Sequence, residues 1–256
     1  MFAALTVFVL SRVGEHRKME RLITTDTLML GTSLMRFAVP DPQAQSLPPS
    51  VVGPHALRLG FSRGSEERLL HFATIGAKAG VPRIILEVNP IVARFADQPS
   101  SCGVAGRAAE KWRTTRQSTR RLVMGRSVFG DAATGVDTYP TGALVQANIA
   151  RLYPLQVLGP CYLEAWQDLV SRHPDTQFIF VVMPRRDVAY EAIGKKAMAA
   201  FDAASRSFAE ATGAALFVVD PAHKWQTQFF AGQAHLSPAG AEKFQTDLIH
   251  WIERRQ

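Results

Sequence analysis

The regular alternation of short apolar runs with helical patterns is the feature that most constrains how this chain folds. Gly, Pro, Asn or Asp bounds each apolar run, which is typical of buried strands. The apolar runs span residues 27–30, 83–88, 177–183 and 214–219, and the helical patterns span 66–79, 197–211 and 240–253. This order predicts a parallel sheet with helices on both faces. Ligands of such folds bind at the carboxyl ends of the strands, so functional residues are expected directly after the apolar runs.

Composition excludes several classes of protein. With 47% hydrophobic and 20% charged residues in a chain of 256, the sequence is not intrinsically disordered, and its length alone allows one large domain or two small ones. The placement of the motifs described below leads us to expect a single domain over residues 1–256. Its two cysteines, Cys102 and Cys161, are too few for a disulfide-dense scaffold. Because no Cys/His spacing of the zinc-site kind occurs, we expect neither a metal nor a cofactor.

The amino-terminal segment is interpreted as an extension outside the catalytic scaffold, residues 1–23. Its apolar run, residues 1–10, is too short to span a membrane, and it lacks the basic start and the small-residue cleavage site of an export signal. We therefore expect no spanning segment and interpret the run as a docking or weakly membrane-associating helix. The compartment stays open between cytoplasm and periplasm.

Three residues with catalytic potential stand at the expected positions. Ser33 follows the first apolar run through Gly31, a residue that allows a sharp strand-to-helix turn. Asn89 follows the second run, and His235 directly precedes a helix start at Ser237. Taken singly, the serine is also explained as a helix N-cap, the asparagine as a turn residue and the histidine as structural.

Together with Gly64, these residues resemble the sequence blocks of the SGNH (GDSL-like) hydrolase and esterase superfamily. The resemblance implies a three-layer α/β/α, flavodoxin-like fold with a mostly parallel five-stranded sheet of order 2-1-3-4-5. It further implies that Ser33 is the nucleophile, that His235 is the base, and that the Ser33 amide, the Gly64 amide and the Asn89 side chain stabilise the oxyanion. The implied substrate is a small-molecule or saccharide ester, commonly an O-acetyl group of a carbohydrate.

The sequence departs from the family pattern at two positions. Thr32 replaces the Asp of Gly-Asp-Ser, and Gly232 stands where the block Asp-x-x-His has its acid. Asp220, at the end of the last apolar run, is a candidate substitute that would orient His235. The alternatives are a Ser-His dyad and a catalytically silent ligand-binding module. Whether the acyl acceptor is water, as in an esterase, or a sugar hydroxyl, as in an acyltransferase, stays open.

Ser62 offers a competing nucleophile. It lies in Gly60-Phe61-Ser62-Arg63-Gly64, which matches the nucleophile elbow of α/β-hydrolases, and Asp and His residues follow it in the required order. That fold encodes several strands before its elbow, whereas only one clear apolar run precedes Gly60. The SGNH interpretation is therefore favoured.

Positive charge is concentrated in one segment. Residues 107–126 hold seven Lys or Arg and one Glu, so they supply +6 of the net charge of +7. The segment lies within an expected insertion, residues 96–150, that has no counterpart in the resemblance. A solvated helix is the simplest interpretation, and a docking surface for an anionic polymer, a lipid headgroup or an acyl carrier is the functional one. We expect no nucleic-acid binding. The candidate substrate contacts are Arg116, Arg120, Arg121 and, after the third apolar run, Arg185.

Overall fold

A computed structural model describes residues 22–40, 47–61, 64–95, 155–232 and 234–255, together with positions 102, 103, 108, 112 and 116. The amino-terminal extension, Ser62, Arg120, Arg121 and most of the basic segment therefore lie outside the described residues. The helices and strands, in chain order, are β1 (Thr27–Gly31), α2 (Ser33–Ala38), α4 (Pro49–Val52), β2 (Ala56–Gly60), α5 (Glu66–Lys78), β3 (Arg83–Glu87), α6 (Asn89–Val92), β4 (Ala93–Phe95), β5 (Leu155–Val157), α9 (Leu163–Arg172), β6 (Gln177–Val182), α10 (Asp187–Ile193), α11 (Lys195–Thr212), β7 (Ala215–Val218), the 3-10 helix η1 (Thr227–Phe229) and α12 (Pro238–Glu253).

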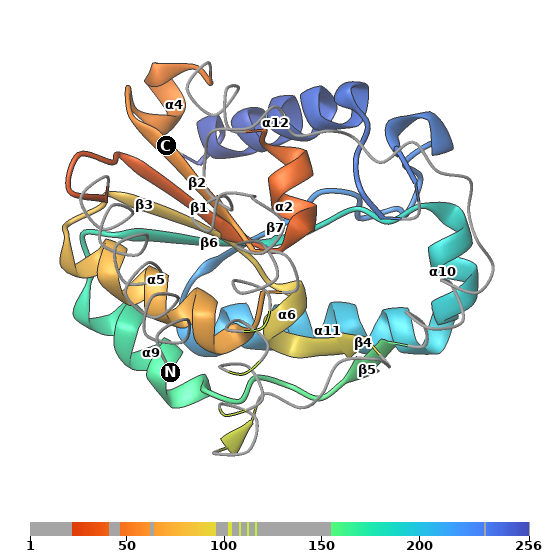
Figure 1. Ribbon diagram of the computed structural model, residues 1–256, viewed down its shortest axis with the longest axis horizontal. Coiled ribbons are helices and arrows are strands. Elements are labelled where there is room, and N and C mark those ends of the chain that lie inside the picture. Colours follow the sequence, from red (N-terminus) through yellow and green to blue (C-terminus); the bar gives the residue numbers. More distant parts are fainter. Residues whose placement is uncertain are drawn as a thin grey trace.

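A five-stranded parallel sheet forms the centre of the fold, in the order β2-β1-β3-β6-β7. Counted along the sheet's own strands, this is the predicted order 2-1-3-4-5. Helices α2 and α12 cover one face, and α5, α9 and α11 cover the other (Figure 1). The three-layer α/β/α prediction is confirmed. The short strands β4 and β5 pair antiparallel outside this sheet.

Burial on both faces explains why most strand residues are apolar rather than alternating with polar ones. Along β6, Phe178, Phe180 and Val182 pack in the cluster under α5, α9 and α11. The intervening Ile179 and Val181 pack in the cluster under α2 and α12. Each face therefore receives every second residue, as the period of a strand requires.

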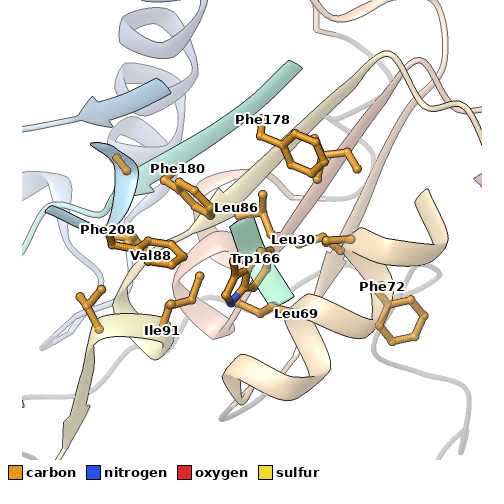
Figure 2. Close-up of a cluster of buried hydrophobic side chains, with 14 of the residues drawn as sticks. Leu30, Leu69, Phe72, Leu86, Val88, Ile91, Trp166, Phe178, Phe180 and Phe208 are labelled. Atoms are coloured by element: carbon orange, nitrogen blue, oxygen red, sulfur yellow. The ribbon is translucent and has the colours of Figure 1, made fainter. Parts of the chain in front are cut away.

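Aromatic side chains fill the layer between the sheet and α9 and α11 (Figure 2). The Trp166 and Phe180 rings meet edge to face at 5.8 Å between centroids, and the Phe180 and Phe208 centroids are 4.7 Å apart. All three side chains are buried. Edge-to-face and tilted contacts of this kind stabilise a core beyond the burial of area alone.

A buried carboxylate, Glu66, joins α5 to α9. The Glu66 oxygens accept hydrogen bonds from the amides of Cys161 and Tyr162 and from the Trp166 indole. Tyr162, at the start of α9, makes no side-chain capping bond, so Glu66 acts as a cap supplied by another helix. Burial raises the pKa of Glu66. Its partner Arg94 lies 3.8 Å away across a buried ion pair.

The two cysteines, which the sequence left without a role, form a disulfide. Cys102 and Cys161 are 59 positions apart in sequence, with Cα atoms 5.3 Å apart. The bond closes a covalent loop that contains the whole basic segment, residues 107–126. It joins Cys102, within the expected insertion, to Cys161, whose amide donates to Glu66 before α9.

Within the described part of the chain, no helix is long and apolar enough to cross a membrane. The same residues contain no group of three His, Cys, Asp or Glu side chains placed to hold a metal ion.

Candidate active site

Ser33 and His235, 202 positions apart in sequence, meet at the carboxyl edge of the sheet. Ser33 is the first residue of α2, directly after β1, and His235 directly precedes the turn into α12. The Ser33 Oγ and His235 Nε2 atoms are 2.9 Å apart, which is hydrogen-bonding distance. With the ring in its Nδ1-protonated tautomer, the serine hydroxyl donates to Nε2. This is the arrangement that activates a serine nucleophile.

His235 is held in a partly buried, largely apolar setting. Its ring packs against Phe37 of α2, with centroids 4.4 Å apart. Burial, and secondarily the positive charge of Arg36, lower the pKa of His235 from 6.5 to about 4. The imidazole is therefore neutral near pH 7, which is the form that can accept the serine proton.

A second buried carboxylate, Glu87, anchors the turn that carries Ser33. Glu87 is the last residue of β3, and its oxygens accept from the Thr32 amide at 2.7 Å and from the Thr32 hydroxyl at 2.8 and 2.9 Å. The Thr32 hydroxyl in turn accepts from the Leu34 amide at 3.1 Å, so Thr32 is the N-cap of α2. Thus Thr32, where the family has Asp, links the nucleophile turn to an acid on the neighbouring strand.

Gly31 is required for this approach. A Cβ atom at Gly31 would lie 2.8 Å from Glu87 Oε2 and would displace the carboxylate. Burial raises the pKa of Glu87, opposed by hydrogen bonds from Thr32 and by the charge of Arg185. Sequence reasoning missed Glu87. The available signal was a single acidic residue closing an apolar strand, two positions before Asn89.

The candidate oxyanion donors have different surroundings. Asn89 begins α6 and is buried, and its side-chain nitrogen and oxygen have no hydrogen-bond partner among the described residues. The described residues therefore leave its side-chain amide unpaired. Gly64 lies beside the nucleophile strand, because a Cβ atom there would be 3.6 Å from the Gly31 carbonyl oxygen. The Gly64 amide, however, donates to the Phe61 carbonyl at 3.1 Å.

Asp220 does not contact the His235 ring within the described residues. Its two oxygens accept from the amides of Lys224 and Trp225, at 2.8 and 2.9 Å. The carboxylate is buried and shapes the loop that follows β7. Position 232, where the family has its acid, is a glycine with φ of 133°, and its carbonyl accepts from Arg186 at 3.2 Å.

The predicted substrate-binding arginines occupy dissimilar places. Arg185 is only 2% exposed, and its guanidinium packs over the Phe201 ring, 4.6 Å from the centroid. Neither terminal nitrogen of Arg185 has a hydrogen-bond partner in the described structure. Arg116 is an exposed helical residue, while Arg120 and Arg121 lie outside the described residues.

Comparison with known proteins identifies the fold. A search of solved structures matches the chain to LAE5, an α/β hydrolase enzyme from the metagenome of Lake Arreo, Spain. The match has a TM-score of 0.50 at 11% identity and covers 90% of this chain and 95% of that one. The chain shares the fold of this hydrolase.

A second match is a putative GDSL-like lipase from Parabacteroides merdae, with a TM-score of 0.45 at 10% identity, covering 90% of this chain and 96% of that one. This likeness is too low to carry an argument. No protein-family model matches the chain, and a search of curated proteins finds no match.

Proposed function

We propose that the protein is a serine esterase or deacylase whose nucleophile is Ser33 and whose general base is His235. The observation that carries the proposal is the 2.9 Å contact between Ser33 Oγ and His235 Nε2 at the carboxyl edge of the sheet. The resemblance to SGNH hydrolases and the hydrolase-type fold support it. Because Asp220 binds backbone amides of its own loop, the proposed machinery is a Ser-His dyad rather than a triad.

The proposed reaction proceeds through a covalent acyl-enzyme. Ser33 Oγ attacks the acyl carbon of the ester while its proton passes to His235 Nε2. The Asn89 side-chain amide and the Ser33 backbone amide stabilise the oxyanion, and the Gly64 amide joins them once it leaves the Phe61 carbonyl. His235 then returns the proton to the departing alcohol oxygen. Water attacks the acyl carbon, its proton passes through His235 back to Ser33, and the acid is released.

A fluorophosphonate probe tests this assignment directly, because it labels activated serines covalently. We expect labelling of the wild type and none of Ser33→Ala, with His235→Gln slowing labelling by about a thousandfold or more. Ser62→Ala is the matched control and should label at the wild-type rate. Labelling that survives Ser33→Ala but disappears in Ser62→Ala would assign the nucleophile to the competing elbow, and a folded protein that never labels would indicate a binding module.

The proposal also covers the class of substrate. The resemblance points to O-acetyl groups of a saccharide, with either water or a second sugar hydroxyl as acceptor. Incubating the enzyme with an acetylated oligosaccharide and an unacetylated one separates the two reactions by mass spectrometry. Free acetate alone identifies an esterase, and acetyl groups on the second oligosaccharide identify a transferase.

The basic segment is proposed to dock an anionic polymer or acyl carrier near the site. Arg116, exposed on its helix, is the part of the predicted surface within the described residues. Neutralising Arg116, Arg120 and Arg121 should raise KM for an anionic ester more at low salt than at high salt, because screening weakens exposed charge pairs. A KM that is unaffected at every ionic strength would contradict the docking role.

The disulfide bears on the compartment. Structural disulfides form and persist in oxidising environments and are rare in the cytoplasm. We therefore propose that the chain works in an oxidising compartment such as the periplasm. Alkylation of intact cells, followed by mass analysis of Cys102 and Cys161, tests this through the fraction of chains that carry both cysteines oxidised.

A further inference from the structure

A cavity of about 660 Å³ lies between α10 and α11, beside the loop that follows β7. Its volume is within the range of about 300–1,000 Å³ that is usual for small-molecule sites. Helix α10 follows the carboxyl end of β6, and the loop follows that of β7, so the cavity belongs to the ligand-binding edge of the sheet. Tyr190, Met198 and Ala199 supply much of its apolar wall.

His223, which also lines this cavity, is placed there by the loop that Asp220 holds. The His223 amide donates to the Asp220 carbonyl at 3.1 Å, and the Asp220 carboxylate fixes the amides of the next two residues. His223 has a φ of 51°, the single positive φ of a non-glycine residue in the described ranges. Left-handed backbone is uncommon for such residues and persists where surrounding contacts impose it. The acid that sequence reasoning assigned to His235 therefore builds the loop that carries His223.

Contacts from two helices hold the His223 ring at the cavity wall. It packs on the Tyr190 ring with centroids 4.4 Å apart. Its Nε2 atom lies 3.4 Å from Asp202 Oδ2 of α11. The cavity is thus bounded by an aromatic face, an imidazole and a carboxylate from three separate elements.

The charge around the cavity is opposite to that of the whole chain. Three carboxylates line it, from Asp187, Glu191 and Asp202, against the single lysine Lys195. These four side chains sum to a charge of −2, in a chain whose net charge is +7. An aromatic face beside carboxylates attracts a cation through both the ring quadrupole and the charges, whereas an anion would be repelled.

We propose that this cavity binds an organic cation with an apolar body, such as a substituted ammonium. The apolar part lies against Met198 and Ala199, and the cationic part faces Tyr190 and Asp202. The site is separate from the Ser33 and His235 pair, and the proposal does not depend on the proposed esterase activity. The wall of the cavity is nevertheless tied to the His235 loop, because Arg186, directly before α10, donates to the Gly232 carbonyl.

Nuclear magnetic resonance of protein carrying ¹³C-labelled methionine methyl groups tests the proposal. The probe is benzyltrimethylammonium, and benzyl alcohol is the uncharged control. We expect the Met198 methyl resonance, assigned by Met198→Leu, to shift with benzyltrimethylammonium, and benzyl alcohol to bind about tenfold more weakly. An unshifted Met198 signal, or equal affinity for the two probes, would overturn the proposal.

Matched variants separate the role of the cavity charge from a general charge effect. Asp202→Asn should weaken binding of the cation about tenfold. Glu210→Gln makes the same charge change at an exposed position of the same helix and should leave the affinity unchanged. Ser33→Ala should also leave it unchanged, because the two sites are separate. Equal losses in Asp202→Asn and Glu210→Gln would show that the cavity does not recognise the cation.

His223→Gly keeps the proposal testable if other variants fold poorly. Glycine adopts a positive φ without steric cost, which offsets part of the stability lost with the ring contacts to Tyr190 and Asp202, so this variant should remain folded. It should bind the cation at least about threefold more weakly, because the ring that packs on Tyr190 is lost. Loss of binding in the folded variant supports a ligand role for His223, and unchanged binding contradicts it.

Discussion

The two halves of the proposed catalytic pair, Ser33 and His235, are supported in opposite ways. On the serine side, a buried carboxylate fixes the turn, because Glu87 accepts from both the amide and the hydroxyl of Thr32. On the histidine side, the ring is held by packing against Phe37, and the nearby acid Asp220 binds its own loop. The difference teaches that the acid of this site holds the turn of the proposed nucleophile, Ser33, whereas the proposed base, His235, relies on burial for its neutral form.

Removing the anchor on the serine side should have the largest effect. Glu87→Ala leaves the Thr32 amide and hydroxyl unpaired, which should lower the free energy of unfolding by about 3 kcal/mol. The released turn should slow fluorophosphonate labelling about a hundredfold at a temperature where the variant is folded. Denaturant titration and labelling rates measure the two effects. The exposed Glu164→Ala is the control and should change neither.

Two substitutions of Thr32 sharpen the interpretation of that result. Thr32→Ser keeps the hydroxyl that donates to Glu87 and should label nearly as fast as the wild type. Thr32→Val removes the hydroxyl and should label slowly while remaining folded. Similar rates in the two variants would show that the carboxylate stabilises the fold without positioning Ser33.

Asp220→Asn tests whether the histidine side truly lacks an acid. Loss of an acid that orients a catalytic histidine costs about 10⁴ in kcat. Because Asp220 instead binds the amides of Lys224 and Trp225, we expect a loss of less than about tenfold in kcat for an aryl ester, measured below the melting temperature of the variant. A loss near 10⁴ would show that Asp220 does orient His235, so that the site is a Ser-His-Asp triad.

Stability as a function of pH measures the burial of His235. Its pKa in the folded state, about 4, is below the ordinary value of 6.5, so the unfolded chain binds more protons between these two values. Stability should therefore fall as the pH drops through this window, by about 2–3 kcal/mol for this one group. His235→Gln should lose this contribution, which denaturant titrations at pH 7 and pH 4.5 would detect as a smaller difference. Identical pH dependence in the two proteins would contradict a buried neutral imidazole.

Arg36 should have the smallest effect, because its charge is the secondary cause of the lowered His235 pKa. Arg36→Gln removes that charge and should raise the pKa of His235 slightly. The pH below which the labelling rate falls should rise accordingly. Arg172→Gln, exposed on α9, is the matched control and should leave this pH unchanged.

Much of the fold follows from the sequence because its determinants are local. Runs such as residues 177–183 are buried on both faces, and this burial is encoded in their continuous apolar character. Ser33, Asn89 and His235 could be nominated because they adjoin strand or helix ends, which turn chemistry marks in the sequence.

The roles of the acids could not be predicted in the same way. Glu87 and Asp220 both close or follow an apolar run, and nothing local distinguishes a carboxylate that holds a nucleophile turn from one that holds its own loop. The role of each carboxylate depends on which backbone amides the fold places beside it. For Glu87 this is the amide of Thr32, 55 positions away, across a strand pairing that periodicity does not specify. The same reason hid the pairing of Cys102 with Cys161.

The disulfide changes what a cut in the chain would do. Residues 102 and 161 are joined covalently, so cleavage of any single peptide bond between them leaves the two fragments attached. A protease that cuts once, after one of the Arg residues of the basic segment, would therefore produce a nicked protein of unchanged size on a non-reducing gel. It would separate into an amino-terminal piece bearing Ser33 and a carboxyl-terminal piece bearing His235 only after reduction.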